Sequence, residues 1–188
     1  MKKSLGARTL VYPTPVLIVG SYNKDGKPNA MAVSWGGVSC SDPPCVVISL
    51  RKATYTFGNI VSRHAFTVSI PSENYAKEAD YFGLASGKSE NKFSRTRLTP
   101  VKGEFVDAPY VQEFPLILEC KVIKTVEIGL HTQFIGEILD VKADESVLGE
   151  DGLPDIKKVR PFILVPECWT YYGIGDCIGD AFSIGKEI

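Results

Sequence analysis

Short apolar runs separated by Gly, Pro, Asn and Asp recur along this chain, and they predict strands rather than long helices. The predicted strands cover residues 16–22, 28–34, 45–50, 65–70, 116–125, 132–143 and 162–165. A turn at 23–26, Asn-Lys-Asp-Gly, makes the first two strands an antiparallel hairpin. Between 116 and 122 the even positions are apolar whereas Glu119 and Lys121 are charged, which predicts one buried and one solvated face.

Only two helices are predicted, and both are short. The first begins after Thr54 as its N-cap, with three apolar residues on its inward face, Phe57, Ile60 and Val61. The second begins after Ser72, with a stripe of residues at helical spacing, Tyr75, Ala79 and Phe82. Residues 83–100 are predicted to form a long polar loop, and residues 144–160 a charged connection.

Because the strands do not alternate with helices in βαβ order, the sequence predicts a mainly β fold. We expect an antiparallel barrel with a few short helices packed on it. We also expect a single domain over residues 1–188, since a chain of this length buries one core. A C-terminal tail at about 166–188 is rich in glycine and aromatic residues without clear periodicity. It either lies over a neighbouring subunit or is a loosely ordered terminus.

Composition narrows the classes of function without selecting one. The formal net charge of −1 argues against nucleic acid or an anionic membrane as the main partner. The five cysteines form no CxxC motif and have no histidine close by, as expected for reduced thiols in a cytosolic protein. No apolar run is long enough for a signal peptide or a transmembrane helix. We therefore expect a cytoplasmic protein.

Residues 28–62 are the stretch around which the rest of the chain is organised. A run of mostly small residues at 29–35 leads through a Gly/Ser/Pro turn into the strand 45–50, which ends at the basic pair Arg51-Lys52. Small side chains let backbone groups lie close to a planar ring. The basic pair and the hydroxyl groups that begin the next helix suit an anion. This combination predicts a site for a phosphate-bearing aromatic cofactor, which we interpret as a flavin.

Several short motifs carry a family resemblance, in the order PNAMAVSW (28–35), DPP (42–44), ISLRKATYTFGNI (48–60), FTVSIP (66–71) and SGKSENKF (86–93). Over about residues 10–165 the chain resembles the flavin-reductase-like FMN-binding proteins of the split-barrel fold. The resemblance implies an antiparallel split β-barrel and a homodimer. It also implies one non-covalently bound FMN per subunit, near the subunit interface.

Taken with this resemblance, sixteen residues are candidates for the FMN site. They are Asn29, Ala30, Met31, Ala32, Ser34, Trp35, Leu50, Arg51, Thr54, Tyr55, Thr56, Ser86, Gly87, Lys92, His131 and Phe162. Asn29 both donates and accepts hydrogen bonds and suits the ribityl or pyrimidine edge of a flavin, although a turn-exit asparagine is the alternative. Main-chain groups around Met31 are expected at the N5, O4 and N3 edge of the ring, or else simply in a core strand.

Two cationic groups are expected at the phosphate. Arg51, at the junction of strand and helix, is expected to bind the phosphate through two N–H groups of its guanidinium. Thr56 and neighbouring N–H groups complete the anion site. The loop with Ser86, Gly87 and Lys92 supplies the second group and is able to close over the phosphate. A charged residue at a strand end or in a loop is also often simply exposed to solvent, so for both groups the alternative is a solvated charge with no role in binding.

Three of the ring-bearing candidates have a structural alternative. Trp35 stacks on or flanks the isoalloxazine, or it is a core tryptophan. His131 heads a long strand; it is either structural or lies near the N1–C2=O region, where it favours the anionic reduced flavin. Phe162 covers the ring from the partner side, or it packs in the core.

The sequence contains no nucleophile–base pair, proton-transfer dyad or metal-ligand cluster, which fits a protein whose side chains tune a flavin. The leading hypothesis is an electron carrier that passes electrons between redox partner proteins through FMN. The alternative is an NAD(P)H-dependent flavin or ferric reductase, which the lack of a GxGxxG motif does not exclude. A third hypothesis is a non-redox barrel that binds nucleic acid or a protein, and a colourless protein unable to bind FMN would favour it.

Overall fold

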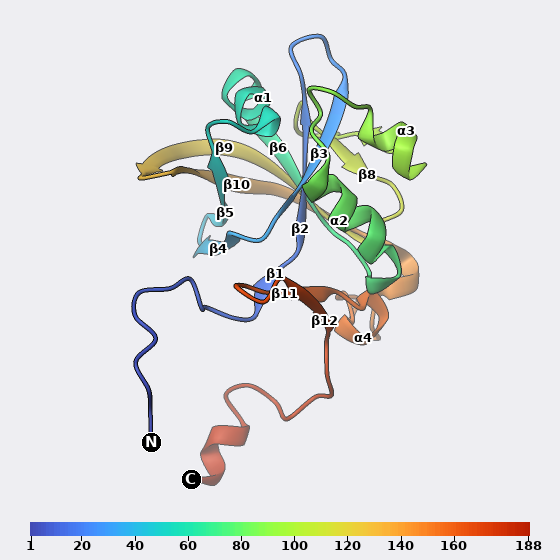
Figure 1. Ribbon diagram of the computed structural model, residues 1–188. Coiled ribbons are helices and arrows are strands. Elements are labelled where there is room, and N and C mark those ends of the chain that lie inside the picture. Colours follow the sequence, from blue (N-terminus) through green and yellow to red (C-terminus); the bar gives the residue numbers. More distant parts are fainter.

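The protein is built around one curled antiparallel sheet of seven strands, in a computed structural model that describes residues 1–188 apart from the side chain of Glu187 (Figure 1). The strand order is β3-β2-β6-β9-β10-β5-β4, and all neighbours are antiparallel. The bounds are β2 Leu17–Tyr22, β3 Pro28–Val33, β4 Gly36–Ser41, β5 Pro44–Arg51, β6 Ala65–Ile70, β9 Leu116–Ile128 and β10 His131–Ala143. The predicted mainly β, antiparallel fold is confirmed.

The sheet curls because its two edge strands are neighbours in the sequence. β3 and β4 lie at opposite edges of the sheet, yet only Ser34 and Trp35 separate them. A link of two residues cannot cross a flat sheet of seven strands, so the two edges must approach each other. The amide of Ser49 on β5 donates a hydrogen bond of 2.8 Å to the carbonyl of Trp35, which continues the β4–β5 pairing one residue beyond Gly36. Ser34 and Trp35 therefore lie at the seam of the barrel.

Five of the strands were not predicted from the sequence. One is β4, and the four shorter ones are β1 (Thr14–Pro15), β7 (Pro100–Lys102), β8 (Pro109–Val111) and β12 (Thr170–Gly173). Proline and glycine have low strand propensity, and one or the other occurs in each of these strands. β1, β11 (Phe162–Val165) and β12 form a three-stranded sheet, while β7 and β8 form a hairpin. The C-terminal tail thus begins with an ordered strand.

Four α-helices and three 3₁₀ turns complete the fold within the described residues, and the last 3₁₀ turn lies in the C-terminal segment, away from the barrel (Figure 1). The helices are α1 (Tyr55–Arg63), α2 (Ala76–Leu84), α3 (Lys92–Thr96) and α4 (Ile156–Val159), and the 3₁₀ turns are η1 (Glu73–Tyr75), η2 (Glu145–Val147) and η3 (Ile184–Glu187). Thr54 is the N-cap of α1 as predicted, and its Oγ1 accepts a hydrogen bond of 3.3 Å from the amide of Phe57. The predicted loop 83–100 contains α3, whose N-cap Asn91 accepts a hydrogen bond from the amide of Ser94.

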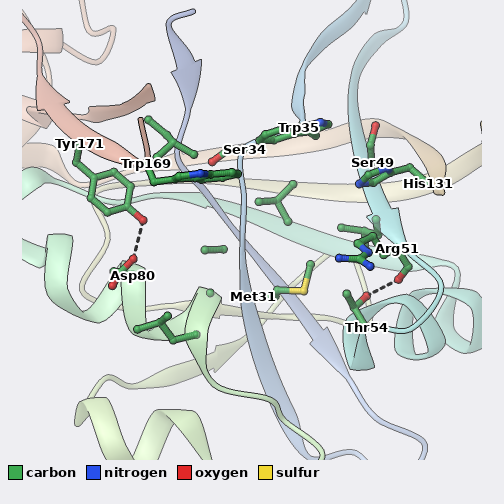
Figure 2. Close-up of a pocket in the computed structure, with 16 residues that line it drawn as sticks. Met31, Ser34, Trp35, Ser49, Arg51, Thr54, Asp80, His131, Trp169 and Tyr171 are labelled. Atoms are coloured by element: carbon green, nitrogen blue, oxygen red, sulfur yellow. Dashed lines mark hydrogen bonds between the residues drawn. The ribbon is translucent and has the colours of Figure 1, made fainter. Parts of the chain in front are cut away.

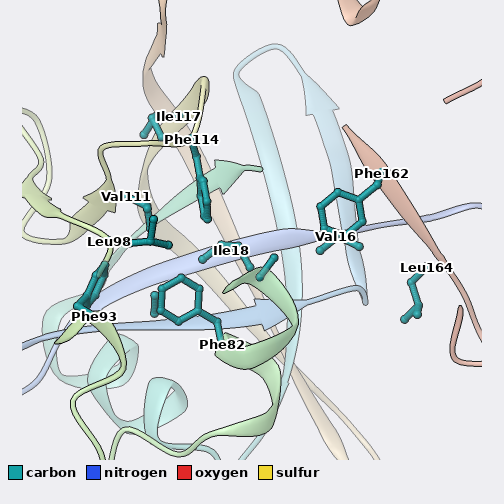
Figure 3. Close-up of a cluster of buried hydrophobic side chains, with 12 residues drawn as sticks. Val16, Ile18, Phe82, Phe93, Leu98, Val111, Phe114, Ile117, Phe162 and Leu164 are labelled. Carbon is teal, nitrogen blue, oxygen red and sulfur yellow. The ribbon is translucent and has the colours of Figure 1, made fainter. Parts of the chain in front are cut away.

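β2 separates two apolar clusters and is buried on both faces, which explains its unbroken apolar sequence. Its odd residues Leu17 and Val19 face the barrel interior, with Val33, Val46, Ile48, Leu50, Ile60, Phe66, Val68, Cys120 and Phe134. Ile18 faces an outer layer between the sheet, α2, α3 and β11 (Figure 3). That layer contains Val16, Ala30, Ala79, Phe82, Phe93, Leu98, Val111, Phe114, Ile117, Phe162 and Leu164. The outer layer fixes α2 and β11, which both contribute to the cavity described below.

The buried face of α1 differs from the prediction at one position. Val61 is 47% exposed, whereas the polar residue Asn59 is buried. Asn59 Nδ2 donates a hydrogen bond of 3.1 Å to Ser21 Oγ on β2, so the helix docks on the sheet partly through a polar contact. The prediction placed apolar residues alone on the inner face and therefore chose Val61.

The solvated face predicted for residues 116–122 is wrong at Glu119, which is completely buried. Its carboxylate accepts hydrogen bonds from the amides of Glu104 (3.2 Å), Phe105 (2.7 Å) and Val106 (3.2 Å), and Lys142 Nζ lies 3.4 Å away. Loop 103–108 covers this face of β9. Its amides give the Glu119 carboxylate the hydrogen bonds that water would give it on the solvated face predicted from the alternating sequence.

Both terminal segments extend away from the barrel on the same side (Figure 1). They carry large apolar side chains that are more than half exposed, such as Val11, Ile178 and Phe182. Among the described residues, no helix is long and apolar enough to cross a membrane.

Candidate functional site

A cavity of about 440 Å³ opens at the seam of the barrel, between β3, β5, α2 and the β11–β12 hairpin (Figure 2). We call it the large cavity. Its lining is formed by Met31, Ala32, Val33, Ser34, Trp35, Ser49, Leu50, Arg51, Thr54, Asp80, Gly83, Leu84, His131, Leu164, Trp169 and Tyr171. Most of its lining surface is apolar, and charged groups lie at its ends, which suits a planar aromatic ligand.

The wall formed by β3 and the seam brings small side chains and main-chain groups to the cavity. β3 ends at Val33, and the chain then leaves the regular ladder through Ser34 and Trp35. Ala32 lies so close to α2 that a Cβ added at Gly83 would be 3.3 Å from the Ala32 methyl group. The short side chains at 32 and 83 therefore let β3 and α2 approach each other at the mouth of the cavity.

The opposite wall brings two basic residues together. His131 begins β10 and lies directly across from Arg51, the last residue of β5. The hydroxyl of Thr54 donates a hydrogen bond of 2.9 Å to the carbonyl of Arg51, which fixes the chain as it leaves β5. Arg51 is exposed and its guanidinium is permanently charged, so this end of the cavity favours negative charge on a ligand.

The remaining wall comes from α2 and β12, which are joined by a hydrogen bond. Tyr171 Oη donates to Asp80 Oδ1 at 2.8 Å. Partial burial, together with the hydrogen bond to Asp80 and the charge of that carboxylate, raises the pKa of Tyr171 to about 12. Tyr171 is therefore protonated at neutral pH and acts as a hydrogen-bond donor that ties the hairpin to the helix.

A second cavity of about 190 Å³ adjoins the first at the start of α1, and we call it the small cavity. It shares four residues with the large cavity, Met31, Thr54, Gly83 and Leu84. The rest of its lining is Asn29, Ala53, Tyr55, Thr56, Ala85, Ser86, Gly87 and Lys92. The first amides of a helix have no partner within the helix, so the start of α1 offers hydrogen-bond donors to an anion here.

Asn29 has one satisfied and one unsatisfied polar atom in the small cavity. Its Nδ2 donates a hydrogen bond of 2.9 Å to Thr56 Oγ1, and its Oδ1 is buried without a hydrogen-bond partner among the described residues. A Cβ added at Gly87 would lie 2.2 Å from Asn29 Oδ1 and 2.7 Å from Tyr55 Cδ1. Gly87 therefore lets its loop close tightly over an acceptor that a ligand hydroxyl or N–H would satisfy.

Lys92 brings a positive charge into the same region. The side chain is 4% exposed, and Nζ donates hydrogen bonds to the carbonyls of Phe82 (3.0 Å) and Ala85 (3.2 Å) at the end of α2. Burial lowers the pKa of Lys92 to about 8, although the charge of Glu90 opposes the shift. The ammonium carries a third hydrogen, which an anion in the small cavity can accept.

The structure brings fourteen of the sixteen predicted site residues to one or the other cavity and leaves out Ala30 and Phe162. Ala30 is completely buried in the outer apolar layer. Phe162 is 4% exposed in the same layer and packs edge-on against Tyr171, with ring centroids 5.3 Å apart. The two predicted cationic groups are also separated, because Arg51 lines the large cavity and Lys92 the small one.

Ten lining residues were not among the predicted site residues. They are Val33, Ser49, Ala53, Asp80, Gly83, Leu84, Ala85, Leu164, Trp169 and Tyr171. Some had a local signal, since Ser49 and Ala53 directly precede the predicted Leu50 and Thr54. Trp169 and Tyr171 are spaced as residues on one face of a strand, but a two-residue spacing in a glycine-rich tail is too short a pattern to identify one.

Comparison with known proteins identifies the family. Residues 8–162 match the flavin reductase like domain. The chain belongs to that family. It superposes on the flavoredoxin of Desulfovibrio vulgaris (Miyazaki F) with a TM-score of 0.95 and 58% sequence identity, over 98% of this chain and 100% of that one. For the flavoredoxin of Methanosarcina acetivorans the TM-score is 0.93 and the identity 34%, over 100% and 98% of the two chains.

A curated but uncharacterised protein of Archaeoglobus fulgidus is also similar, at 35% identity over 130 residues, which is 69% of this chain and 72% of that protein. The family assignment and the two flavoredoxins confirm the predicted split-barrel fold and the predicted flavin redox function. Within the family, the sequence motifs resemble those of flavoredoxins, and the two superpositions agree with this.

The residues present fit a flavin mononucleotide. The unsatisfied Oδ1 of Asn29 needs a donor, which a ribityl hydroxyl supplies. Lys92 and the start of α1 need an anion, which a phosphate supplies. The large cavity has the apolar lining and, at about 440 Å³, the volume for a planar ring system.

Proposed function

We propose that this protein is a flavoredoxin-like electron carrier, which takes electrons from one redox protein and passes them to another through a non-covalently bound FMN. The observation that carries this proposal is the small cavity, where a buried acceptor without a partner lies beside a buried lysine and a helix start. That cavity adjoins a larger one lined by both tryptophans of the chain.

The chain divides the work of binding between the two cavities. In the small cavity, Lys92 and the first amides of α1 hold the phosphate, and Asn29 with Thr56 holds the ribityl chain. In the large cavity, main-chain groups around Met31 and the seam residue Trp35 border the ring. The loop at Gly87 encloses the phosphate end because no side chain keeps it away from Asn29.

The bound flavin supplies the redox chemistry, since it accepts electrons singly or as a hydride. Arg51 and His131 at the end of the large cavity place positive or polarisable groups where reduction adds negative charge. They favour the reduced cofactor electrostatically without transferring a proton. The apolar residues of β3, β5 and β11 exclude water from the ring.

We further propose that the protein is a homodimer in the cytoplasm. Val11, Ile178 and Phe182 are 77%, 90% and 96% exposed on the two terminal segments, and a second subunit is the cover we propose for them. The five cysteines are free thiols within the described structure, which supports a reducing compartment.

A second candidate is an NAD(P)H-dependent flavin reductase, favoured by the description of the family as flavin reductase like. The two candidates differ in the electron donor and share the cofactor. Anaerobic stopped-flow reduction of the FMN-loaded protein by NADH and by NADPH separates them, because rapid reduction by either nucleotide contradicts the carrier.

The proposal as a whole is tested by titrating the purified protein with FMN and recording the visible spectrum before and after anaerobic reduction. We expect tight stoichiometric binding and a reversible loss of the flavin absorption. Sedimentation of the loaded protein tests the dimer, and a monomer at all concentrations contradicts it. A protein that binds no FMN contradicts the electron-carrier proposal entirely.

A further inference from the structure

The rim of the large cavity is completed by the β11–β12 hairpin, which comes from the C-terminal end of the chain. Its turn, residues 166–169, ends with Trp169 at the cavity, and Tyr171 follows two positions later. Trp169 is 68% exposed although it lines the cavity, so one part of its indole faces the cavity and the rest faces solvent. Figure 2 shows Trp169 and Tyr171 at the end of the cavity away from Arg51 and Thr54.

The backbone of this turn is held in an unfavourable conformation. Glu167 has a φ of 69° and Trp169 a φ of 53°, both in the left-handed region. Residues other than glycine enter this region at an energetic cost, and a bulky residue is seldom found there. Such strain persists where the surroundings fix the backbone, and it concentrates at positions that contact ligands.

Contacts on both sides fix the hairpin. On one side, Tyr171 Oη donates its hydrogen bond of 2.8 Å to Asp80 on α2. On the other side, the Glu167 carboxylate accepts hydrogen bonds from Arg8 Nη1 at 3.3 Å and from Thr9 Oγ1 at 3.1 Å, in the N-terminal segment. The indole of Trp169 is therefore presented at the rim by two elements from distant parts of the chain.

The two tryptophans of the chain line the same cavity but are positioned differently. Trp35 lies at the seam and is fixed by the barrel itself, through the hydrogen bond from Ser49 to its carbonyl. Trp169 belongs to the separate three-stranded sheet and borders the cavity from outside the barrel. Trp169 therefore borders the entrance of the cavity, where its position depends on contacts made outside the barrel.

We propose that Trp169, held at the rim by the β11–β12 hairpin, determines which class of reductant reaches the cofactor. It keeps a nicotinamide dinucleotide away from the ring and reserves the site for protein electron donors. The inference rests on the proposed function, since it concerns the flavin that the large cavity is proposed to hold.

The reason lies in the geometry that each donor needs. A dihydronicotinamide reduces a flavin by moving one hydride, two electrons with their proton, from its C4 to the ring, and is left as the oxidised cation. The two rings must meet face to face with the reacting atoms about 3–3.5 Å apart. An indole at the open rim takes the place that the second ring requires. A protein donor transfers electrons without stacking a ring, so the covered cavity still accepts them.

The first test compares four forms of the FMN-loaded protein in anaerobic stopped-flow reduction by NADH and NADPH: wild type, Trp169→Ala, Trp169→Phe and Tyr172→Phe. Tyr172 is the matched control, because it lies in the same hairpin, on β12, is 58% exposed and does not line the large cavity. We expect Trp169→Ala to be reduced about tenfold faster than wild type or more, with saturation by the nucleotide. Trp169→Phe is expected to restore most of the protection, and Tyr172→Phe to behave as wild type.

The second test needs no reductant. Lifetime-resolved quenching of the bound flavin's fluorescence by iodide measures how freely a small solute reaches the ring. We expect the bimolecular quenching constant to rise severalfold in Trp169→Ala and to stay near the wild-type value in Trp169→Phe and Tyr172→Phe. An unchanged quenching constant in Trp169→Ala, with FMN still bound, overturns the proposal.

The outcomes for the carrier and for the role of Trp169 are separable. Slow reduction of wild type with fast reduction of Trp169→Ala supports both. Slow reduction of both forms agrees with the electron-carrier proposal and contradicts the proposed role of Trp169. Rapid reduction of wild type by either nucleotide overturns the carrier and, with it, the exclusion by Trp169.

Discussion

The small and the large cavity differ in how their residues are fixed. In the small cavity Asn29, Thr56 and Lys92 are at most 4% exposed, and each makes a hydrogen bond to the protein. In the large cavity Arg51 is exposed and Trp169 is 68% exposed at the rim. The first site is preformed and rigid, whereas the second is bordered by groups that solvent reaches. Affinity for the cofactor should therefore depend on the small cavity, and reactivity on the large one.

This division is open to test, because a change in each cavity should affect a different measurement. Changes in the small cavity should weaken FMN binding and leave the reduction potential of the remaining holoprotein almost unchanged. Changes in the large cavity should alter the reduction potential and leave FMN binding almost unchanged. The size of the effect should follow burial, since a fixed group that loses its partner has no solvent to replace it.

The largest effect is expected for Gly87→Ala. The new methyl group would lie 2.2 Å from Asn29 Oδ1 and 2.7 Å from Tyr55 Cδ1, so the loop or Asn29 must shift. Overpacking of this kind costs about 3 kcal/mol at its upper end, which corresponds to roughly a hundredfold weaker FMN binding. Titration with FMN, followed by flavin fluorescence, measures the loss.

Gly58→Ala is the matched control, because a Cβ at Gly58 in α1 meets nothing within 4 Å. Alanine is favoured over glycine inside a helix by about 1 kcal/mol, so this variant should be slightly more stable and bind FMN as wild type does. Undiminished FMN binding by a folded Gly87→Ala protein would show that the loop does not close on the ligand.

Lys92→Met is expected to weaken FMN binding by about 2 kcal/mol, since it removes a charge-assisted hydrogen bond and a buried positive charge. The effect should depend on pH. With its pKa lowered to about 8, Lys92 loses its proton as the pH rises through 8, and the affinity of wild type for FMN should fall there. Isothermal titration between pH 6.5 and 9.5 should show this fall in wild type and not in Lys92→Met.

The stability of the cofactor-free protein should change with the opposite sign. Burial lowers the pKa of Lys92 from 10.5 to about 8, so between these values the unfolded chain binds more protons than the folded one. Stability then rises with pH across this window, by up to about 3 kcal/mol from this residue. Urea unfolding of wild type and Lys92→Met at pH 7.5 and 10 measures it, and an equal pH response of the two proteins contradicts the assignment.

The same division explains what the sequence could predict. Asn29, Thr56, Gly87 and Lys92 lie in short motifs whose residue types already indicate an anion site and a tight loop, and all four line the small cavity. The strands and the cap at Thr54 were predictable for a similar reason, since periodicity and capping act over a few residues. Each of these residues is identified by its own short motif, although only the fold brings the motifs together, as with Asn29 and Thr56, which are 27 positions apart.

The large cavity was only half predictable, because distant parts of the chain complete it. Asp80 and Tyr171 are 91 positions apart and meet only because β12 pairs with β11 and the outer apolar layer fixes α2. Glu119 was placed on the wrong face for the same reason, since loop 103–108 covers it from outside the strand. Alternation along one strand does not reveal what packs on either face.

In the large cavity, Arg51→Gln should change the reduction potential with little effect on affinity. The guanidinium is positive at every working pH, so it stabilises the reduced flavin, which carries more negative charge. Because the group is exposed, we expect only about 1 kcal/mol, a potential lower by roughly 20 mV for two electrons. The difference should shrink as salt is added. Lys52→Gln is the control, since Lys52 pairs with Glu127 at 2.7 Å and lines neither cavity.

The smallest effect is expected for Tyr171→Phe, which removes only the hydrogen bond from β12 to Asp80. Since the pKa of Tyr171 is raised to about 12, the hydroxyl donates this bond throughout the neutral range. Its loss should cost about 0.5–1 kcal/mol and let the hairpin open more often. Amide hydrogen exchange of residues 166–173 should quicken by about threefold, whereas Tyr172→Phe, on the same strand, should not alter it. FMN affinity should hold within about twofold in both variants. A loss of FMN affinity as large as that in Lys92→Met would show that the hairpin belongs to the FMN-binding site. It would contradict the division of affinity and reactivity between the two cavities.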